Sequence, residues 1–559
     1  MEFSLAKIDL TKQKIEKKQI PKKLIHEWLG GRGLGAALLS EDVRGPTDPK
    51  SSLFITTGPV TGTMLPSSSR LEVTGISPLT GFYLGSNAGG HFGWRLRSQG
   101  YYAIQVTGKS KKPVYAAIMD GKLSLHDAKD EWGLTTGELI KRFDAEKASV
   151  ACIGQGGENF VRFASLQFDW RSAGRGGAGA ILGSKKLKAI VVNTGKKVDV
   201  HDEARVRELS KKLFKNKNLA TNRLSSCGTS NVVEYSNKIR TFPVDNYRKN
   251  HTPQAKKINA FAVQKVTESD WGCWNCPVRC ERITKSKKYN ALARGPEYET
   301  IFSLGSDCEN YDMDVLIKAN DLCDNYGLDT ISCGATIAWF RECCQKGLVK
   351  EKWAGNEMIL DLIEKIAFRK GIGDLLAEGS FRASEKIPGS KEFLAGGKGL
   401  ESPAWDPRSS WATALCYATS PTGADHRKGR PVEDDLKSLR PLSTKGKAKI
   451  AIKDQDKRAA SDSTGFCGFV DGHFDSQDII EAINSTAGLN VDEEFLQSLG
   501  GKIIQLERKI NIEAGLTKKD DTLSERLLNY PMKVYLKTSL IGEKNLEEMK
   551  KEYYKLRGW

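Results

Sequence analysis

Three cysteines that fall within eight residues constrain this fold more than any other feature of the sequence. Cys273, Cys276 and Cys280 stand at x2 and x3 spacings, so their thiols can converge on one small metal centre. Iron–sulfur clusters take four thiolates, and structural zinc takes four nitrogen or sulfur ligands. A zinc module usually supplies a second short-spaced pair nearby, and none is visible. The pattern favours an iron–sulfur centre and leaves zinc or unliganded structural cysteines open.

A fourth ligand must then come from a distant part of the chain, and the candidates are Cys308, Cys323, Cys333 and Cys467. Twelve cysteines in 559 residues are too sparse for a disulfide scaffold. No apolar run approaches the roughly 18 residues that cross a bilayer. The N-terminus lacks the apolar core of a signal peptide. We therefore expect a cytoplasmic protein that does not enter a membrane.

The charge balance is basic, with 86 Lys and Arg against 69 Asp and Glu, a net charge of +17. The lysines are scattered, and no recognisable nucleic-acid module accompanies them. A solvated lysine-rich surface is the simplest interpretation, and docking of an acidic protein is the next. We do not expect a nucleic-acid partner.

The pattern of residue types changes twice along the chain, near residues 200 and 396. Up to about residue 195, short apolar runs bounded by Gly or Pro predict strands, and Asp120-Gly121 predicts a hairpin turn. From about residue 200 the apolar spacing becomes helical. Helices are expected near 201–217, 312–324, 331–348, 356–370, 476–512 and 543–556. We predict a β-rich domain over 1–197 and two mainly helical domains over 198–395 and 396–559, an α+β fold.

Three glycine-rich stretches lie in the β-rich region: Gly30–Gly35, Gly85–Gly90 and Gly174–Gly179. Glycine lets the backbone approach a ligand, and nearby arginines can bind phosphate with two parallel hydrogen bonds. Ordinary turn glycines are the alternative. The first stretch follows a helix-like segment rather than a strand, so it does not match a dinucleotide-binding fingerprint.

Two further patterns carry polar residues. Asp324 and Asp462 each begin an Asp-x-x-Gly-apolar sequence, which alone is typical of ordinary loops. Glu299 in Glu-Tyr-Glu and His426 in a loop of small residues are acid–base candidates. A lone histidine is more often structural than catalytic.

Taken together, these residues resemble the tungsten-containing aldehyde ferredoxin oxidoreductase family over nearly the whole chain. The segments GGRGLGAALL, GSNAGGHFGWRLRSQGYYAIQVTGKS and RGGAGAILGSKKLKAIVV come first. GPEYETIFSLGS, the two Asp-x-x-Gly sequences, WDPRSSWATALCYATSPTGADHRKG and YYKLRGW follow in family order. The resemblance implies a β-sheet domain that carries the cofactor and two mainly helical domains that cover it.

The resemblance also implies the cofactors and their residues. A tungsten ion held by the dithiolenes of two pterins would lie beside a [4Fe–4S] cluster bound by Cys273, Cys276, Cys280 and Cys467. The first pterin motif would contain Asp324, Gly327, Leu328 and Asp329, and the second Asp462, Gly465 and Phe466. The phosphate side would contain Arg70, Asn87, Ala88, Gly89, Arg175, Gly176 and Gly177. A Mg²⁺ ion would bridge the phosphates through carbonyls near Asn87 and Ala178.

By the same resemblance the chain would oxidise a small aldehyde, with Glu299 as base and His426 orienting substrate or relaying a proton. Electrons would pass singly through the cluster to ferredoxin or a ferredoxin-like iron–sulfur subunit. The Glu-x-x-His dimer metal site of some members has no counterpart in DMDVLIKANDLC, which leaves the form of any homo- or hetero-oligomer open.

Two rival functions differ in what they require. The tungsten subunit of a benzoyl-CoA-type reductase is favoured mildly by Cys333, because a thiolate ligand to tungsten belongs to that branch. The Asn87-Ala88-Gly89-Gly90 sequence favours the aldehyde branch. A non-catalytic iron–sulfur subunit would not need both pterin Asp motifs. For Cys333 itself, a buried apolar filler is the other interpretation.

Overall fold

The first strands build two six-stranded mixed sheets. The computed structural model describes residues 2–144, 146–216, 219 and 223–559. In spatial order the first sheet contains β2 (Lys14–Gln19), β1 (Ser4–Asp9), β6 (Ala103–Thr107), β3 (Leu53–Thr57), β4 (Leu71–Ile76) and β5 (Tyr83–Ala88). The second contains β11 (Arg171–Ala173), β10 (Leu166–Phe168), β9 (Ala148–Cys152), β12 (Leu187–Asn193), β7 (Val114–Met119) and β8 (Lys122–Asp127).

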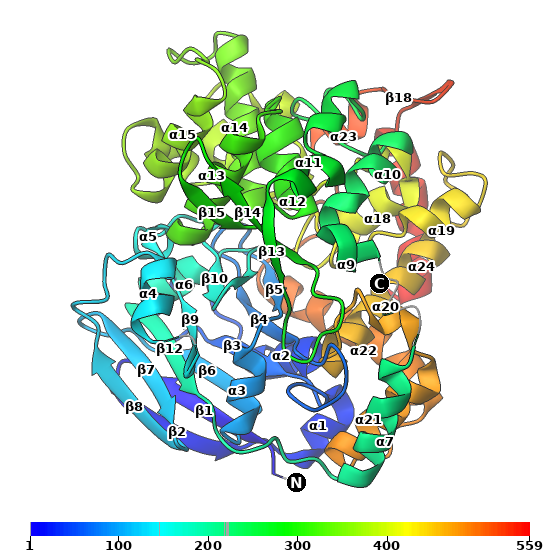
Figure 1. Ribbon diagram of the computed structural model, residues 1–559. Coiled ribbons are helices and arrows are strands. Elements are labelled where there is room, and N and C mark those ends of the chain that lie inside the picture. The colour runs from blue at the N-terminus through cyan, green and yellow to red at the C-terminus, as the bar shows by residue number, and fades with distance from the viewer. Residues whose placement is uncertain (1, 145, 217–218, 220–222) are drawn as a thin grey trace.

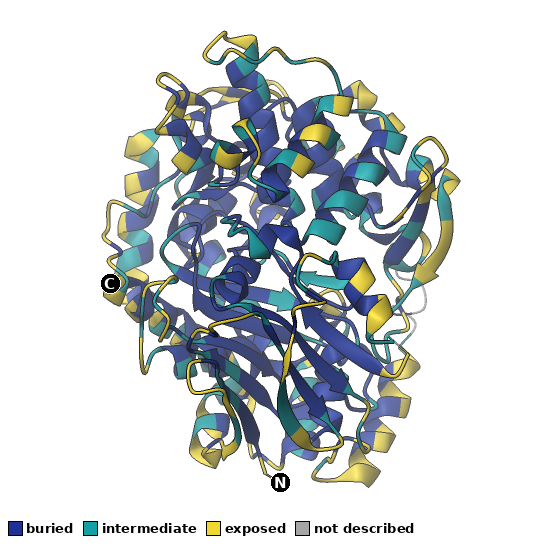
Figure 2. Ribbon diagram, turned by 90° about the vertical axis from the view of Figure 1, so that its left-hand side faces the viewer, coloured by how far each residue is buried: buried dark blue, intermediate teal, exposed yellow. Residues whose placement is uncertain are grey.

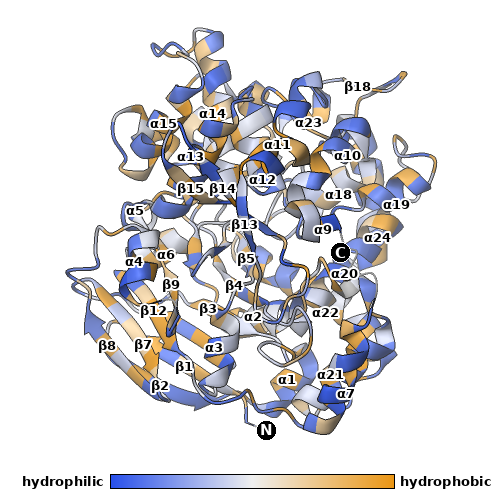
Figure 3. Ribbon diagram, in the orientation of Figure 1, coloured by the Kyte–Doolittle hydropathy of each residue, from blue (hydrophilic) through white to orange (hydrophobic). Residues whose placement is uncertain are grey.

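Each sheet is antiparallel except for one parallel pair, β1 with β6 and β12 with β7. One apolar core contains residues of both sheets, such as Ile55 and Val106 from the first and Ile118 and Ile190 from the second. Figure 3 shows apolar residues concentrated on β7 and β12. The predicted hairpin is confirmed, because Asp120 and Gly121 have φ of 51° and 76° between β7 and β8.

Six helices belong to the same N-terminal region: α1 (Lys22–Trp28), α2 (Gly31–Leu39), α3 (Phe92–Ser98), α4 (Thr136–Arg142), α5 (Gln155–Glu158) and α6 (Ala178–Ser184). Helix α2 packs on β3 and β4 with one side. Its other side packs on two helices of the C-terminal region, α20 (Lys447–Thr464) and α22 (Glu493–Glu513). Its Arg32 is fully buried and donates two hydrogen bonds to Glu507, at 2.7 and 2.9 Å. The beginning and the end of the chain therefore share one core.

The middle region is mainly helical, as predicted. It contains α7 (Glu203–Phe214), α9 (Arg223–Cys227), α10 (Val232–Lys238), α11 (Ala260–Lys265), α12 (Tyr298–Thr300), α13 (Met313–Tyr326), α14 (Thr330–Gln345), α15 (Glu357–Ala367), α16 (Ile372–Leu376) and α17 (Ser380–Ser384). A three-stranded sheet of β13 (Thr267–Trp271), β14 (Glu281–Ser286) and β15 (Ala291–Arg294) joins these helices to the N-terminal sheets (Figure 1).

The C-terminal region contains α18 (Trp411–Thr419), α19 (Val432–Lys437), α20 (Lys447–Thr464), α21 (Ser476–Ala487), α22 (Glu493–Glu513), α23 (Glu525–Asn529) and α24 (Gly542–Arg557). Short strand pairs β16 (Gly396–Gly397) with β17 (Leu400–Glu401) and β18 (Met532–Val534) with β19 (Lys537–Ser539) complete it. The helix expected over 476–512 is in fact two helices. Gly488, at φ 64°, ends α21, and the Asp492 side chain caps α22 by accepting from Phe495 N at 2.8 Å.

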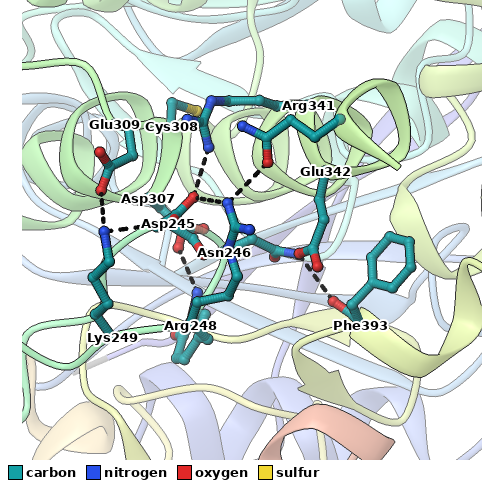
Figure 4. Close-up of polar contacts among 12 residues, drawn as sticks. Asp245, Asn246, Arg248, Lys249, Asp307, Cys308, Glu309, Arg341, Glu342 and Phe393 are labelled. Carbon is teal, nitrogen blue, oxygen red and sulfur yellow. Dashed lines mark hydrogen bonds and ion pairs between the residues drawn. The ribbon is translucent and has the colours of Figure 1, made fainter. Parts of the chain in front are cut away.

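A buried polar network lies in the middle region around Asp245, Asn246 and Glu342 (Figure 4). Asp245 accepts from Arg341 at 2.6 Å, and Asn246 Nδ2 donates to Glu342 at 2.7 Å. Glu342 also accepts two hydrogen bonds from Arg526 of α23, at 2.6 and 2.9 Å. Figure 2 shows buried strands through the centre of the lower half and exposed residues at its periphery. Within the described residues, no helix combines the length and apolar character needed to cross a bilayer.

Candidate active site

A cavity of about 280 Å³ lies where the three regions of the chain meet. Nine of the residues selected from the sequence line it: Arg70, Asn87, Gly89, Arg175, Cys280, Glu299, Asp324, Leu328 and Asp329. The other selected residues lie outside the lining: Ala88, Gly176, Gly177, Ala178, Gly327, His426, Asp462, Gly465, Phe466, Cys273, Cys276 and Cys467. Several of these residues contact residues that line the cavity, so most of the predicted site residues lie in one part of the structure.

Arg70 links the cavity to the thiol region. Its Nη1 donates to Asn87 Oδ1 at 3.1 Å, and its Nη2 donates to Cys467 Sγ at 3.0 Å. Arg70 Nε and Asn87 Nδ2 are buried without a hydrogen-bond partner among the described residues. Leaving a buried donor without an acceptor costs free energy, so these two donors are suited to hydrogen bonds with a bound group.

Arg175 crosses the cavity from the N-terminal region to the other two. Its Nη2 donates to Glu401 O at 2.6 Å, and its Nε lies 3.4 Å from Asp329 Oδ2. The two following glycines turn away from the cavity: Gly176 O accepts from Ser77 Oγ at 2.8 Å, and Gly177 precedes α6. Of this stretch, Gly174 and Arg175 line the cavity.

Both Asp-x-x-Gly sequences are helix C-termini. Gly327 ends α13 at φ 67°, and Gly465 ends α20 at φ 96°. Left-handed backbone favours glycine, which explains the glycine three residues after each aspartate. The sequence pattern was therefore not an ordinary loop signal. It places Asp324 and Asp462 in the last turns of two helices.

The surroundings of the two aspartates differ. Asp324 Oδ2 accepts from Asn320 Nδ2 at 2.7 Å, and burial, followed by the nearby Glu281, raises the pKa of Asp324 well above its usual range. Asp462 Oδ1 accepts from Arg427 at 3.1 Å, while its Oδ2 is buried without a hydrogen-bond partner among the described residues. Arg427 also lines the cavity, so it joins the second motif to it.

The remaining motif residues support the backbone. The Asp329 side chain caps α14 by accepting from Ile331 N at 3.1 Å and Ser332 N at 3.2 Å. Leu328 N donates to Cys323 O at 2.8 Å. The first glycine-rich stretch forms the start of α2 and lies against the second motif, where Gly33 N donates to Ser463 Oγ at 3.0 Å. That stretch does not line the cavity.

A loop of the N-terminal region holds the thiols together. Ser67 N donates to Asn275 O at 2.9 Å, and Ser67 O accepts from Cys467 N at 3.1 Å. Ser67 Oγ donates to Cys276 Sγ at 3.2 Å. A Cβ on Gly89 would lie 2.9 Å from Cys273 Sγ, so glycine is needed there for the thiol to fit. The loop thus brings Cys467 beside the short-spaced cysteines.

The other candidate fourth ligands lie apart from these thiols. Cys308, Cys323 and Cys333 are buried in the apolar core of the middle region. Cys308 Sγ donates to Ser303 O at 3.2 Å, and Cys323 contacts Cys333. Cys333 lies outside the cavity lining, in the position of an apolar filler.

The described residues contain no group of three or more His, Cys, Asp or Glu side chains close enough to hold a single ion. An iron–sulfur cluster is wider than one ion, so its thiolates stand farther apart than the ligands of a mononuclear site. Burial raises the pKa of both Cys276 and Cys280. A metal must therefore replace protons that these thiols hold in its absence.

Glu299 and His426 face each other, with Glu299 Oε1 3.6 Å from His426 Nε2. Glu299 Oε2 accepts from Ala404 N at 2.8 Å, and Oε1 is buried with no hydrogen-bond partner in the described part of the chain. Burial raises the pKa of Glu299 to about 7. Burial also lowers the pKa of His426 to about 3, although the nearby Asp425 opposes this. A carboxyl group that titrates near neutrality suits proton transfer.

Sequence reasoning missed much of the charge in the cavity. Arg171, Arg294, Arg427, Lys428 and Glu281 line it, and so do Glu297 and Asp425, which belong to the Glu-Tyr-Glu and Asp-His sequences of the acid–base candidates. Their signal was their position: Arg171 stands four residues before Arg175, and Arg427 and Lys428 directly follow His426. With Arg70 and Arg175, six cationic side chains line a space large enough for an anionic ligand.

Comparison with known proteins covers almost the whole chain. The family model for the aldehyde ferredoxin oxidoreductase N-terminal domain matches residues 5–194, and the model for domains 2 and 3 of the same family matches residues 205–559. The tungsten-containing aldehyde ferredoxin oxidoreductase of Pyrococcus furiosus is 36% identical over 581 residues, covering 99% of this chain and 95% of that protein.

Two further matches are more distant. The aliphatic sulfonate oxidoreductase WOR-like subunit of Pyrococcus furiosus is 26% identical over 607 residues, covering 99% of this chain and 94% of that protein. A chain of the benzoyl coenzyme A reductase complex BamBC, solved with 1,5-dienoyl-CoA, superimposes with a TM-score of 0.87 at 22% identity, covering 100% of this chain and 95% of that one. At this identity the likeness concerns the fold.

Proposed function

The chain belongs to the aldehyde ferredoxin oxidoreductase family and is an oxidoreductase. From this premise we propose that it oxidises an aldehyde to a carboxylate, with a tungsten bis-pterin in the cavity and a [4Fe–4S] cluster on the adjacent cysteines. One observation carries the proposal. The cavity contains buried donors that lack a hydrogen-bond partner among the described residues, and it lies close to the two helix C-termini that carry Asp324 and Asp462 and to the four thiols.

The residues present fit a bis-pterin. The donors on Arg70, Asn87 and Arg175 match phosphate oxygens, and guanidinium groups bind phosphate well. Asp324 and Asp462 offer carboxyl oxygens to the amino and ring N–H groups of a pterin. We assign one pterin to each aspartate. A Mg²⁺ between the phosphates, held through carbonyls near Asn87 and Ala178, completes this proposal.

The thiol site fits a cubane cluster. Cys273, Cys276, Cys280 and Cys467 provide the four thiolates such a cluster takes. Hydrogen bonds from Ser67 and Arg70 to two of the sulfurs, at 3.2 and 3.0 Å, stabilise the anionic ligands. Arg70 also lines the cavity, so one side chain lies between the two cofactor sites.

The chain's own residues supply proton transfer. Oxidation of an aldehyde hydrate to its carboxylic acid releases two electrons and two protons, and a third proton leaves as the acid ionises. A tungsten centre, when bound, would supply the acceptor for these two electrons. Glu299 Oε1 faces His426 and has no hydrogen-bond partner among the described residues, so it can accept a proton from the hydrate hydroxyl or from water. His426 stays neutral near pH 7 and orients the substrate through its ring nitrogens.

The electron acceptor we propose is ferredoxin or a similar acidic iron–sulfur protein. A surface hollow of about 360 Å³ is lined by Cys273 and Cys276 and by His91, Phe214 and Trp271. Lys211 and Lys215 are exposed at the end of α7 beside Phe214. Positive charge beside partly exposed cluster ligands supports docking of an acidic carrier at this place.

The aldehyde function is favoured over reduction of an aromatic thioester. The thioester reading drew on Cys333 as a tungsten ligand, and that thiol lies outside the cavity lining. A non-catalytic iron–sulfur subunit would not need two aspartates and an acid–base pair around a cavity lined by arginines. The oligomeric arrangement is not part of the proposal.

The test is a count of W, Mo, Fe and pterin in anaerobically purified protein. We expect one tungsten, two pterins and four irons per chain. Asp324→Asn and Asp462→Asn should each lower pterin and tungsten content while leaving the fold intact by circular dichroism. Full pterin content in both variants would contradict the assignment of one pterin to each aspartate.

A further inference from the structure

We propose that Arg171 sets the reduction potential of the cluster site, as a largely shielded positive charge held between Cys280 and the cavity, with Glu297 as its counter-charge. The inference rests on the proposed function, because it needs a cluster on the four cysteines. It concerns a residue that none of the sequence motifs singled out.

The Arg171 guanidinium contacts a cysteine thiol with one nitrogen and two carboxylates with another. Its Nη2 donates to Cys280 Sγ at 3.7 Å. Its Nη1 lies 3.1 Å from Glu297 Oε1 and 3.3 Å from Glu281 Oε1. Arg171 and Cys280 also line the cavity. The guanidinium is therefore within contact of a cluster ligand and faces the space proposed for the pterins.

Arg171 is held in place by its surroundings. It begins β11, directly after the tight turn at Asp169 and Trp170, and its side chain is 16% exposed. The guanidinium lies 5.7 Å from the Trp271 ring centroid. Its Nε is buried without a hydrogen-bond partner among the described residues. A fixed, poorly solvated charge acts on its neighbours more strongly than a mobile surface charge does.

Two carboxylates, Glu281 and Glu297, partly offset the positive charge of Arg171. Glu281 is shared with Arg294, whose Nη1 lies 3.1 Å away, so one carboxylate balances two cations. Glu297 is the more accessible carboxylate, with 32% of its side chain exposed against 2% for Glu281. Thr229 Oγ1 donates to the other oxygen of Glu297 and fixes its orientation.

The sign of the effect follows from charge. Reduction adds one electron to the cluster, and a nearby positive charge stabilises the added electron, which raises the potential. A hydrogen bond to a ligand sulfur acts in the same direction. Removing the Arg171 charge should therefore lower the potential. Removing the Glu297 charge should raise it, by a smaller amount because Glu297 is better solvated.

The experiment is a redox titration of the anaerobic holoenzyme followed by electron paramagnetic resonance of the reduced cluster. Arg171→Gln should move the midpoint to a more negative value, Arg171→Lys should restore part of the shift, and Glu297→Gln should move it to a more positive value. Arg162→Gln is the matched control. Arg162 is another half-buried arginine, paired with Glu378 at 2.9 Å and outside the cavity lining, and its replacement should leave the midpoint unchanged.

The outcomes separate the two proposals. Wild-type protein without four irons and a cluster signal would overturn the proposed function. A normal cluster whose midpoint is the same in Arg171→Gln, or a shift in the same direction for Arg171→Gln and Glu297→Gln, would overturn the role of Arg171 alone. If Arg171→Gln loses its iron, the direction of the shift in Glu297→Gln decides the matter.

Discussion

Replacing Glu299 by glutamine tests the candidate site directly, because the amide keeps the shape and removes the proton-accepting charge. The amide oxygen can still accept from Ala404 N, which lies 2.8 Å from Oε2 in the native side chain. The changed atom faces His426 Nε2 at 3.6 Å. Any loss of activity at full cofactor content then reports on basicity rather than on packing.

The magnitude follows from the pKa of about 7 that burial gives Glu299. Such a base is about one-tenth ionised one unit below its pKa, so kcat/KM should fall about tenfold per unit on the acid side and level off above. The low pKa of His426, about 3, keeps the imidazole neutral here, so it adds no second limb. The variant should lose about 10²–10⁴-fold and show no acid limb.

The same burial predicts a change in stability. The unfolded carboxyl titrates near 4.5, so between pH 4.5 and 7 the folded protein retains a proton that the unfolded chain has released. Stability therefore falls as pH rises through this window, by about 3 kcal/mol once Glu299 is ionised. Glu299→Gln removes this cost. It should resist denaturant better than wild type above pH 7 and lose most of that advantage near pH 5.

The assay is anaerobic aldehyde oxidation with a small dye, at equal tungsten and iron content per chain. A wild-type rate that stays level from about pH 5.5 to about 8.5, or a variant within about threefold of wild type, would refute the role of Glu299 as base. A variant that loses activity together with tungsten would instead assign Glu299 to cofactor retention.

Three further predictions use the same protein. Cys467→Ser should lose most cluster absorbance and iron, whereas Cys308→Ser should keep both; the opposite result would move the fourth ligand into the helical core. Cys333→Ser should leave metal content and activity within about twofold, as expected of an apolar filler, and a changed tungsten–sulfur count by X-ray absorption would contradict this. Reduction of ferredoxin should slow as salt rises, and it should also be slower in the Lys211→Glu variant than in wild type. Dye reduction should change little with salt, and the exposed control variant Lys122→Glu should reduce ferredoxin at nearly the wild-type rate. Equal salt sensitivity with both acceptors would argue against docking by charge.

Local patterns predicted most of the secondary structure. The Asp120-Gly121 turn follows from residue types alone, and so do the apolar runs that form β7 and β12. The Asp-x-x-Gly sequences were visible, but their meaning was not. An aspartate three residues before glycine fits a loop as well as the last turn of a helix, and only the tertiary fold decides between them.

The missing part of the site was its charge network. Arg171 contacts Glu281 and Glu297 across more than a hundred residues of sequence, and no local pattern encodes such a pairing. The same holds for Ser67, which joins the Cys276 loop to Cys467 through backbone and side-chain hydrogen bonds. Ligand types could be predicted from spacing, but the groups that orient and tune them lie on distant parts of the chain, in a loop for Ser67 and on β11 for Arg171.

The buried contact between Arg32 and Glu507 affects how the chain can fold while it is being synthesised. The two residues are 475 positions apart in sequence. At the usual 5–20 residues per second, a ribosome needs roughly 24–95 s to deliver Glu507 after Arg32 has been made. Until then helix α2 lacks Glu507, and for most of the interval it also lacks the α20 and α22 surfaces that cover it. The first part of the chain to be synthesised is thus among the last to be completed, and a fragment ending before Glu507 should depend on chaperones to stay in solution.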